Sequence, residues 1–125
     1  MSIAKLNNDY VKFTHETKDN MEYKTLEMLF NENGSDENKV YTVWGAYINE
    51  GKYGKQGLLV TDDCYVNLPK HLTDDVENIR ADENIINQIN KGQAGFTIYH
   101  YYSRKYNKDC FSLNWVDIKP ELEEI

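Results

Sequence analysis

The stretch KGQAGFTIYHYYSRKYNKDCFSLNWVD, residues 91–117, decides the fold of this chain. Aromatic and aliphatic side chains alternate with other residues along 95–102 and again along 110–118. This alternation is typical of β-strands that turn one face towards a core. Between the two runs, residues 103–108 carry three cations and one tyrosine. The pattern therefore predicts a long β-hairpin with a basic, aromatic tip.

Charge is distributed unevenly along the chain. The net charge is −7, yet residues 84–108 contain no Asp or Glu. The acids gather in residues 74–83 and again in residues 121–124. A protein that covers phosphates needs cations at the contact, but the rest of its surface can be acidic. The overall charge therefore does not exclude a nucleic acid as the partner.

Length and composition predict one folded domain. The chain has 125 residues, of which 40% are hydrophobic and 13% aromatic, enough for a single core. We expect an N-terminal arm over residues 1–20, a domain over residues 21–119 and an acidic tail over residues 120–125. No stretch approaches the roughly 18 apolar residues of a membrane-spanning helix, and the N-terminus lacks the apolar core of a signal peptide. A cytoplasmic location without membrane contact is expected.

Three strands are expected before the hairpin. The first covers residues 22–30, where a helix competes because three of the apolar residues also fit a period of 3.6. The second covers residues 39–49, and Gly45 within it indicates a bulge or a sharp bend. The third begins at residue 56 and ends at residue 61 or 66, before the Leu-Pro pair that closes it.

One helix is expected between the third strand and the hairpin. Within residues 73–91 the period changes, and either Thr73 or Asp82 can serve as the N-cap. Three isoleucines form an apolar stripe after Asp82, and Gly92 stands where a helix takes its C-terminal glycine. The residues taken as core are Trp44, Phe96, Ile98, Phe111, Leu113 and Trp115.

The predicted fold is mainly β with one helix. Five strands with a helix between the third and the fourth is the element order of the five-stranded, OB-like Greek-key barrel. That fold binds oligonucleotides or oligosaccharides on strands 2–3 and on the loops 1–2 and 4–5. The basic, aromatic tip of the hairpin falls in loop 4–5 of such a barrel.

Tyrosines and cations coincide in two parts of the chain. A sequence-tolerant binder of single strands needs aromatic rings for base stacking and cations for phosphates. The candidate nucleic-acid-binding residues are Tyr41, Tyr47, Lys52, Tyr53, Lys55, Tyr99, Tyr101, Arg104, Lys105, Tyr106 and Lys108. A plainer interpretation stands beside this one, because the tyrosines can cover a sheet or a dimer interface and the cations can be solvated turn residues.

Catalytic and metal sites are not indicated. The three histidines, His15, His71 and His100, lack paired ligand spacing, and the two cysteines lack metal spacing and are expected to be reduced thiols. No Walker lysine loop, dinucleotide glycine fingerprint or Gly-x-Ser-x-Gly elbow is present. Adjacent acids such as Asp62 and Asp63 more often cap or solvate a turn than hold Mg²⁺. We therefore predict neither an enzyme nor a cofactor.

Three runs resemble one protein family. GKYGKQG at 51–57, YVNLP at 65–69 and INKGQAGFTIYHYYSRKYNKDCFSLNWVDI at 89–118 resemble the small single-stranded-DNA-binding proteins of tailed phages of lactococci and streptococci. The resemblance covers roughly the C-terminal two-thirds of the chain. It implies an OB barrel, non-specific binding of single-stranded DNA in phage DNA replication or recombination, a homodimer, and a location in the host cytoplasm. The implied DNA contacts are the aromatic and basic residues of strand two, of the 50–57 turn and of the 99–108 hairpin.

The C-terminal sequence ELEEI distantly resembles the acidic tails by which bacterial single-strand binders recruit replication proteins. It lacks their Gly/Gln-rich linker and aromatic end, so a solvated terminus is expected.

Two other classes of function stay open. An acidic phage protein can mimic DNA and bind a host nuclease or defence protein, here through the carboxylates of residues 62–83. The chain can also be an adaptor whose tyrosines form a protein interface. The first alternative predicts no affinity for oligonucleotides, and the second predicts no salt-dependent binding to DNA.

Overall fold

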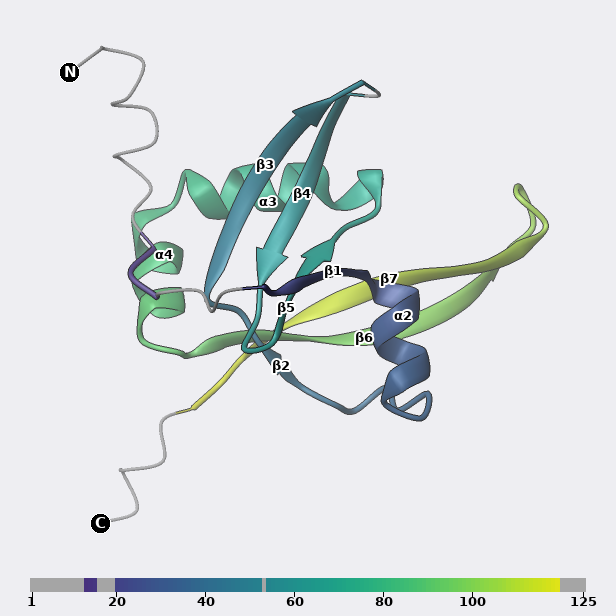
Figure 1. The fold of residues 1–125 in the computed structure, drawn as a ribbon, viewed down its shortest axis with the longest axis horizontal. Coiled ribbons are helices and arrows are strands. Elements are labelled where there is room, and N and C mark those ends of the chain that lie inside the picture. The colour runs from purple at the N-terminus through teal and green to yellow at the C-terminus, as the bar shows by residue number, and fades with distance from the viewer. Residues whose placement is uncertain (1–12, 16–19, 53, 120–125) are drawn as a thin grey trace.

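The computed structural model describes residues 13–15, 20–52 and 54–119, and the described chain is mainly β, as predicted (Figure 1). The strands are β1 (Glu22–Thr25), β2 (Tyr41–Thr42), β3 (Gly45–Gly51), β4 (Gly54–Val60), β5 (Cys64–Asn67), β6 (Ala94–Ser103) and β7 (Lys108–Asp117). The helices are α2 (Leu26–Glu32), the 3-10 helix η1 (Lys70–Leu72), α3 (Thr73–Arg80) and α4 (Glu83–Asn90).

The strands form two sheets that are joined by one bent run. The four-stranded sheet has the order β1-β5-β4-β3, and the three-stranded sheet has the order β2-β6-β7. At the bend, the Val43 N–H donates to the Ala94 carbonyl oxygen (2.9 Å), while the Trp44 N–H donates to the Val60 carbonyl oxygen (2.7 Å). These two residues therefore connect β2 in one sheet to β3 in the other. The expected second strand over residues 39–49 thus divides into β2 and β3, and the change of direction falls at residues 43–44, just before the predicted Gly45.

The predicted closed barrel is not confirmed. β5 pairs with β4 and, in parallel, with β1, whereas β7 pairs with β6 alone in the ranges described. Side chains of residues that follow β5 in the sequence contact β7 at the place where a closed barrel would have a strand pairing. His71 Nε2 lies 2.9 Å from Ser112 Oγ, and Trp115 Nε1 donates to Asp75 Oδ2 (2.9 Å). Side-chain hydrogen bonds thus occupy the seam where a strand pairing would close the barrel.

The expected strand over residues 22–30 is wrong beyond its first four residues. Thr25 has an extended backbone, and its hydroxyl accepts a hydrogen bond from the Met28 N–H (3.2 Å), so it caps α2. Leu26, Leu29 and Phe30 then lie on the buried face of that helix. The helical period of the apolar residues, together with the cap, outweighs the strand pattern.

The expectation of a single helix is also wrong, because three α-helices are found in the described chain. Residues 73–91 divide into α3 and α4, and Asp82 Oδ1 caps α4 by accepting from the Asn84 and Ile85 N–H groups. Gly92 ends α4 with a φ of +72°, as predicted. The expected third strand likewise divides into β4 and β5 around the turn at 62–63.

The core lies between the two sheets and the helices. Phe96 and Ile98 of β6 are fully buried, and so is Leu113 of β7 at 5% exposure. Phe111 is partly buried against the same cluster. The two tryptophans were expected in the core but lie at its edge. Trp44 is half-buried and its Nε1 donates to the exposed Asp62 Oδ1 (2.6 Å), and Trp115 is 37% exposed and donates to the half-buried Asp75.

The described part of the N-terminal arm contacts the domain. The Phe13 ring meets the Tyr47 ring edge-on at 5.5 Å, and the His15 ring stacks on Trp44 at 4.6 Å. The rest of the expected arm up to residue 12, residues 16–19, Tyr53 and the acidic tail over 120–125 lie outside the described residues. In the described part, no helix has the length and the apolar character needed to cross a membrane.

Candidate nucleic-acid interface

Two hairpins extend from the body of the molecule in different directions. The β3–β4 hairpin and the longer β6–β7 hairpin both leave the core, and β5 lies between their bases (Figure 1). β6 and β7 pair along their whole length, from Ala94 with Asp117 to Ser103 with Lys108. The predicted long hairpin is therefore confirmed, including its turn over residues 104–107.

A groove of about 400 Å³ lies where β5 and β7 fail to pair, and we call it the β5–β7 groove. It is lined by Thr25, Leu26, Glu27, Gln56, Asn67, Leu68, Pro69, His71, Tyr101, Tyr106, Lys108, Asp109, Cys110 and Phe111. One wall thus comes from the β6–β7 hairpin, and the other comes from β4, β5, η1 and the start of α2.

The hairpin wall offers aromatic rings and a cation. Tyr101 is 41% exposed and Tyr106 is 62% exposed, and Lys108 is exposed beside them. The ring of Tyr99 contacts Tyr101 at 6.1 Å between centroids and so supports it from behind. Partial desolvation raises the pKa of Tyr101 above its ordinary value. The neutral phenol can donate a hydrogen bond as well as accept one.

The opposite wall offers amide and imidazole groups. Gln56 Nε2 donates to the Leu68 carbonyl oxygen (3.1 Å), which holds the amide in place and leaves its oxygen as an acceptor. Asn67 is half-buried at the end of β5. His71 is held by its contact with Ser112 Oγ. This wall can form hydrogen bonds with a flat polar ring that lies against Tyr101 or Tyr106.

A second aromatic surface lies on the outer face of the four-stranded sheet. The register places Tyr47, Leu58 and Asn67 in one row across three strands, so the outer face leads directly to the β5–β7 groove. In the next row, the rings of Tyr23 and Tyr65 stack at 4.8 Å. Tyr23 is 59% exposed.

Tyr47 is fixed by its neighbours on this face. The Arg80 guanidinium lies 5.6 Å from its ring centroid, and Arg80 Nη1 donates to the Ala46 carbonyl oxygen (2.9 Å) at the edge of β3. Burial raises the pKa of Tyr47 and the Arg80 charge opposes that rise. With 38% exposure, the ring is partly available to a ligand.

Only part of the predicted site residues come together. Tyr101, Tyr106 and Lys108 line the groove, and Tyr99 supports it. Arg104 and Lys105 are exposed on the turn beyond the groove, where the Lys105 ammonium lies 5.4 Å from the Tyr106 ring centroid.

The remaining predicted residues lie elsewhere. Tyr41 stacks on Phe96 at 5.3 Å and accepts a hydrogen bond from Asn33 Nδ2, so it belongs to the edge of the core. Lys55 pairs with Glu77 of α3 (3.3 Å). Both residues therefore lie apart from the groove, Tyr41 against β6 and Lys55 beside α3. Tyr53, another predicted residue, is outside the described ranges.

Lys52 occupies an adjoining hollow. This hollow of about 360 Å³ is lined by Lys52, Lys70, Asn49 and Gln56, among others, and it shares Gln56 with the groove. Cations therefore lie on both sides of Gln56, with Lys52 and Lys70 on one side and Lys108 on the other.

Sequence reasoning missed the polar wall and the outer aromatic surface. Gln56, Asn67, His71 and the stacked pair of Tyr23 and Tyr65 were not among the predicted residues. A signal for Tyr65 and Asn67 was present, because they alternate with the buried Cys64 and Val66 along β5. Tyr23 could not be found in this way, because its place depends on the parallel pairing of β1 with β5.

No group of three or more His, Cys, Asp or Glu side chains that could hold a metal ion occurs in the part of the chain that the structure describes. Neither Cys64 nor Cys110 forms a disulfide. Comparison of the chain with protein-family models, with curated proteins and with solved structures finds no match.

Proposed function

We propose that this protein binds single-stranded DNA, without sequence specificity, in the β5–β7 groove. The observation that carries the proposal is the composition of that groove, in which two exposed tyrosines and Lys108 face the side chains of Gln56 and Asn67. Aromatic rings stack on bases of any sequence, and cations contact the phosphates between them. Both elements meet here in one concave surface.

The strand pairings support an open, OB-like arrangement as part of the proposal. β2 and β3 together act as one bent strand, in which β3 pairs with β4 and β2 pairs with β6. β4 also pairs with β5, and β6 also pairs with β7. A helical segment separates β5 from β6. When the β2–β3 run is counted as the first strand of an OB fold, β4 is the second, β5 the third, β6 the fourth and β7 the fifth. The turn at 51–54 is then loop 1–2 and the turn at 104–107 is loop 4–5, the two loops with which OB folds bind oligonucleotides.

The energetics set the expected strength of binding. Stacking contributes about 1–3 kcal/mol per base, so Tyr101 and Tyr106 together supply about 2–6 kcal/mol. A micromolar complex needs about 8 kcal/mol. Phosphate contacts from Lys108 and further rings on the outer face must therefore contribute. Glu27 and Asp109 also line the groove and repel phosphates, so we expect micromolar affinity at low salt.

Fluorescence anisotropy of a labelled oligo-dT tests the proposal. We expect single-stranded DNA to bind more tightly than a duplex of the same length and to dissociate as salt is raised. Tyr101→Ala should weaken binding about 5- to 150-fold. The matched control is Tyr102→Ala, because Tyr102 is the next residue along β6, is 57% exposed and does not line the groove.

A second matched pair tests the cation in the groove. Lys108→Ala should reduce the slope of log affinity against log salt by about 0.7, the value for one phosphate contact on a single strand. Lys91→Ala removes an exposed cation that belongs neither to the groove nor to the 104–107 turn and should change the slope less. The proposal is wrong if oligo-dT does not bind at low salt, or if the paired variants behave alike.

The proposed biological role follows from the resemblance of the three sequence runs. It is the protection or presentation of single strands during phage DNA replication or recombination, by a homodimer in the host cytoplasm that meets replication or recombination proteins there. The same titration separates this role from DNA mimicry, because a protein that mimics DNA does not bind oligo-dT.

A further inference from the structure

A second, apolar pocket lies on another part of the molecule, between the helices and the bases of the last two strands. It has a volume of about 310 Å³ and involves α3, α4, β6 and β7. The β5–β7 groove shares none of its lining residues. The pocket meets β7 at Trp115, and the groove meets it at Phe111, so about four residues or roughly 13 Å of strand separate them.

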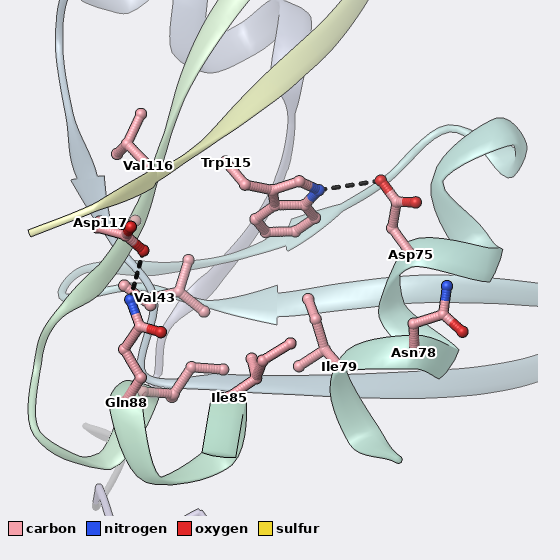
Figure 2. Close-up of a pocket in the computed structure, with 12 residues that line it drawn as sticks. Val43, Asp75, Asn78, Ile79, Ile85, Gln88, Trp115, Val116 and Asp117 are labelled. Carbon is pink, nitrogen blue, oxygen red and sulfur yellow. Dashed lines mark hydrogen bonds between the residues drawn. The ribbon is translucent and has the colours of Figure 1, made fainter. Parts of the chain in front are cut away.

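The floor of the pocket is aliphatic and its upper wall is aromatic. Figure 2 shows Val43, Ile79 and Ile85 side by side, with the Trp115 ring above them. Ile85 is only partly buried and Trp115 is 37% exposed, so the apolar surface is open to solvent. A partner that covers such a surface removes apolar area from water, which favours binding.

Two hydrogen bonds with carboxylate acceptors stand at opposite ends of this floor (Figure 2). At one end, Trp115 Nε1 donates to Asp75 Oδ2 (2.9 Å). At the other end, Gln88 Nε2 donates to Asp117 Oδ1 (2.6 Å). Each bond uses one oxygen and fixes the carboxylate, and an ionised carboxylate can accept further hydrogen bonds through both of its oxygens.

The charge of the rim is negative. Among the described residues that line the pocket, none is Lys or Arg, whereas Asp75 and Asp117 are both present. Asp74 and Glu83 are exposed on the same two helices. Phosphates and acidic peptide segments are repelled from such a rim. A complementary partner has a positive charge on each side of an apolar group.

We propose that this pocket is a docking site for a segment of another protein in which one large apolar side chain is flanked by Lys or Arg. The apolar side chain enters between Ile79 and Trp115, and the flanking cations reach Asp75 and Asp117. Interfaces commonly concentrate their binding energy in one such anchor inside a desolvated pocket. The oppositely charged rim speeds the encounter and excludes acidic segments. A protein that binds DNA through its groove could in this way hold a basic partner beside it.

A displayed library of random peptides, selected against the full-length protein, tests the proposal. We expect the selected peptides to carry one Leu, Ile, Phe or Trp with Lys or Arg on both sides. Asn78→Trp is the blocking variant, because Asn78 is an exposed residue of α3 that lines the pocket. It should weaken the binding of a selected synthetic peptide about 30-fold or more, as the loss of an anchor does. Asn84→Trp, exposed on α4 but outside the pocket, is its control.

A second pair of variants tests the charges without removing hydrogen-bond acceptors. Asp75→Asn with Asp117→Asn should weaken the peptide about three- to tenfold at low salt. Asp74→Asn with Glu83→Gln removes the same charge outside the pocket and should have a smaller effect. All variants should melt cooperatively near the wild-type temperature, which keeps a folding defect from being taken for lost binding.

The proposal is overturned by selection of peptides without this pattern, by failure to select any, or by unchanged binding to Asn78→Trp. It does not depend on the DNA-binding proposal, because Asn78→Trp should leave oligo-dT binding unchanged. If oligo-dT itself is displaced by the selected peptides, the pocket and the groove are one site and the inference is likewise wrong.

Discussion

A methyl group added at Gly57 is expected to push β4 away from α3. A Cβ atom at this position would lie 2.8 Å from Cγ2 of Val76 and 3.4 Å from Cδ1 of Leu68. Val76 is fully buried, so it has no free space into which to move. Overpacking of this kind costs about 1–3 kcal/mol, slightly offset by the lower backbone entropy of alanine in the unfolded chain. Gly57→Ala alone should therefore lower the free energy of unfolding by about 2 kcal/mol.

The companion change is Val76→Ala, which removes the atom that clashes. Alone, it deletes two buried methyl groups and should cost about 2 kcal/mol. In the double variant, the new methyl at residue 57 fills part of the space that Val76 leaves, and the remaining Cβ of Val76 is 3.4 Å away. The double variant should lose about 2 kcal/mol, whereas independent effects would add to about 4 kcal/mol.

Urea unfolding followed by far-ultraviolet circular dichroism measures these changes. We expect a coupling energy of about 2 kcal/mol between the two substitutions. The effects of independent substitutions add to within roughly 0.5 kcal/mol, so a coupling of this size is measurable. Additive costs would show that α3 does not press on β4 at Gly57. In that case the placement of η1 beside the β5–β7 groove, which follows from the packing of α3, would lose its support.

Three further changes have defined outcomes. Asp82→Ala should cost about 1 kcal/mol, because it removes the N-cap of α4, whereas Asp82→Asn keeps a capping oxygen and should cost little in the same urea assay. Arg80→Ala should cost about 1.5–3 kcal/mol through the lost hydrogen bond to the Ala46 carbonyl oxygen, and a loss below the error of the assay would contradict that role. Burial raises the pKa of Tyr41 above 10.0 more than the Asn33 hydrogen bond lowers it. The contribution of Tyr41 to the free energy of unfolding should then be fully present below pH 10 and be lost as the pH rises through the folded-state pKa. Tyr41→Phe should flatten this fall in stability, and an equal fall in both proteins would contradict the role given to Tyr41.

The last two strands could be predicted because their alternation is long. Large apolar residues recur at every second position at 96 and 98 of β6 and at 111, 113 and 115 of β7, and no helical period competes. Asp82 and Gly92 were predictable for a similar reason, since caps act within one turn of the chain.

The open arrangement of the two sheets could not be predicted, because it depends on contacts between distant residues. β1 is four residues long and pairs with β5 in parallel, which leaves no local sequence pattern. The contacts of His71 with Ser112 and of Trp115 with Asp75 join residues 41 and 40 positions apart. Nothing in the local sequence indicates that these side chains replace a strand pairing.

The candidate site was predictable in part for the same reason. Tyr101, Tyr106 and Lys108 were found because they belong to one hairpin. Gln56 and Asn67 were not, because they join the site only when the four-stranded sheet brings β4 and β5 to face that hairpin. The position of Tyr41 apart from the groove could not be predicted, because it depends on a stacking contact with Phe96, 55 positions away.

The central claim is that single-stranded DNA lies in the β5–β7 groove, and a titration of the ¹⁵N-labelled protein with oligo-dT tests it most directly. Backbone amide shifts report where the DNA lies, whatever its affinity. We expect the largest shifts at residues 67–71 and 101–111, smaller ones at Tyr47 and Tyr65, and none at residues 75–89. Shifts concentrated at residues 75–89, or no shifts at low salt with DNA in excess, would contradict the claim.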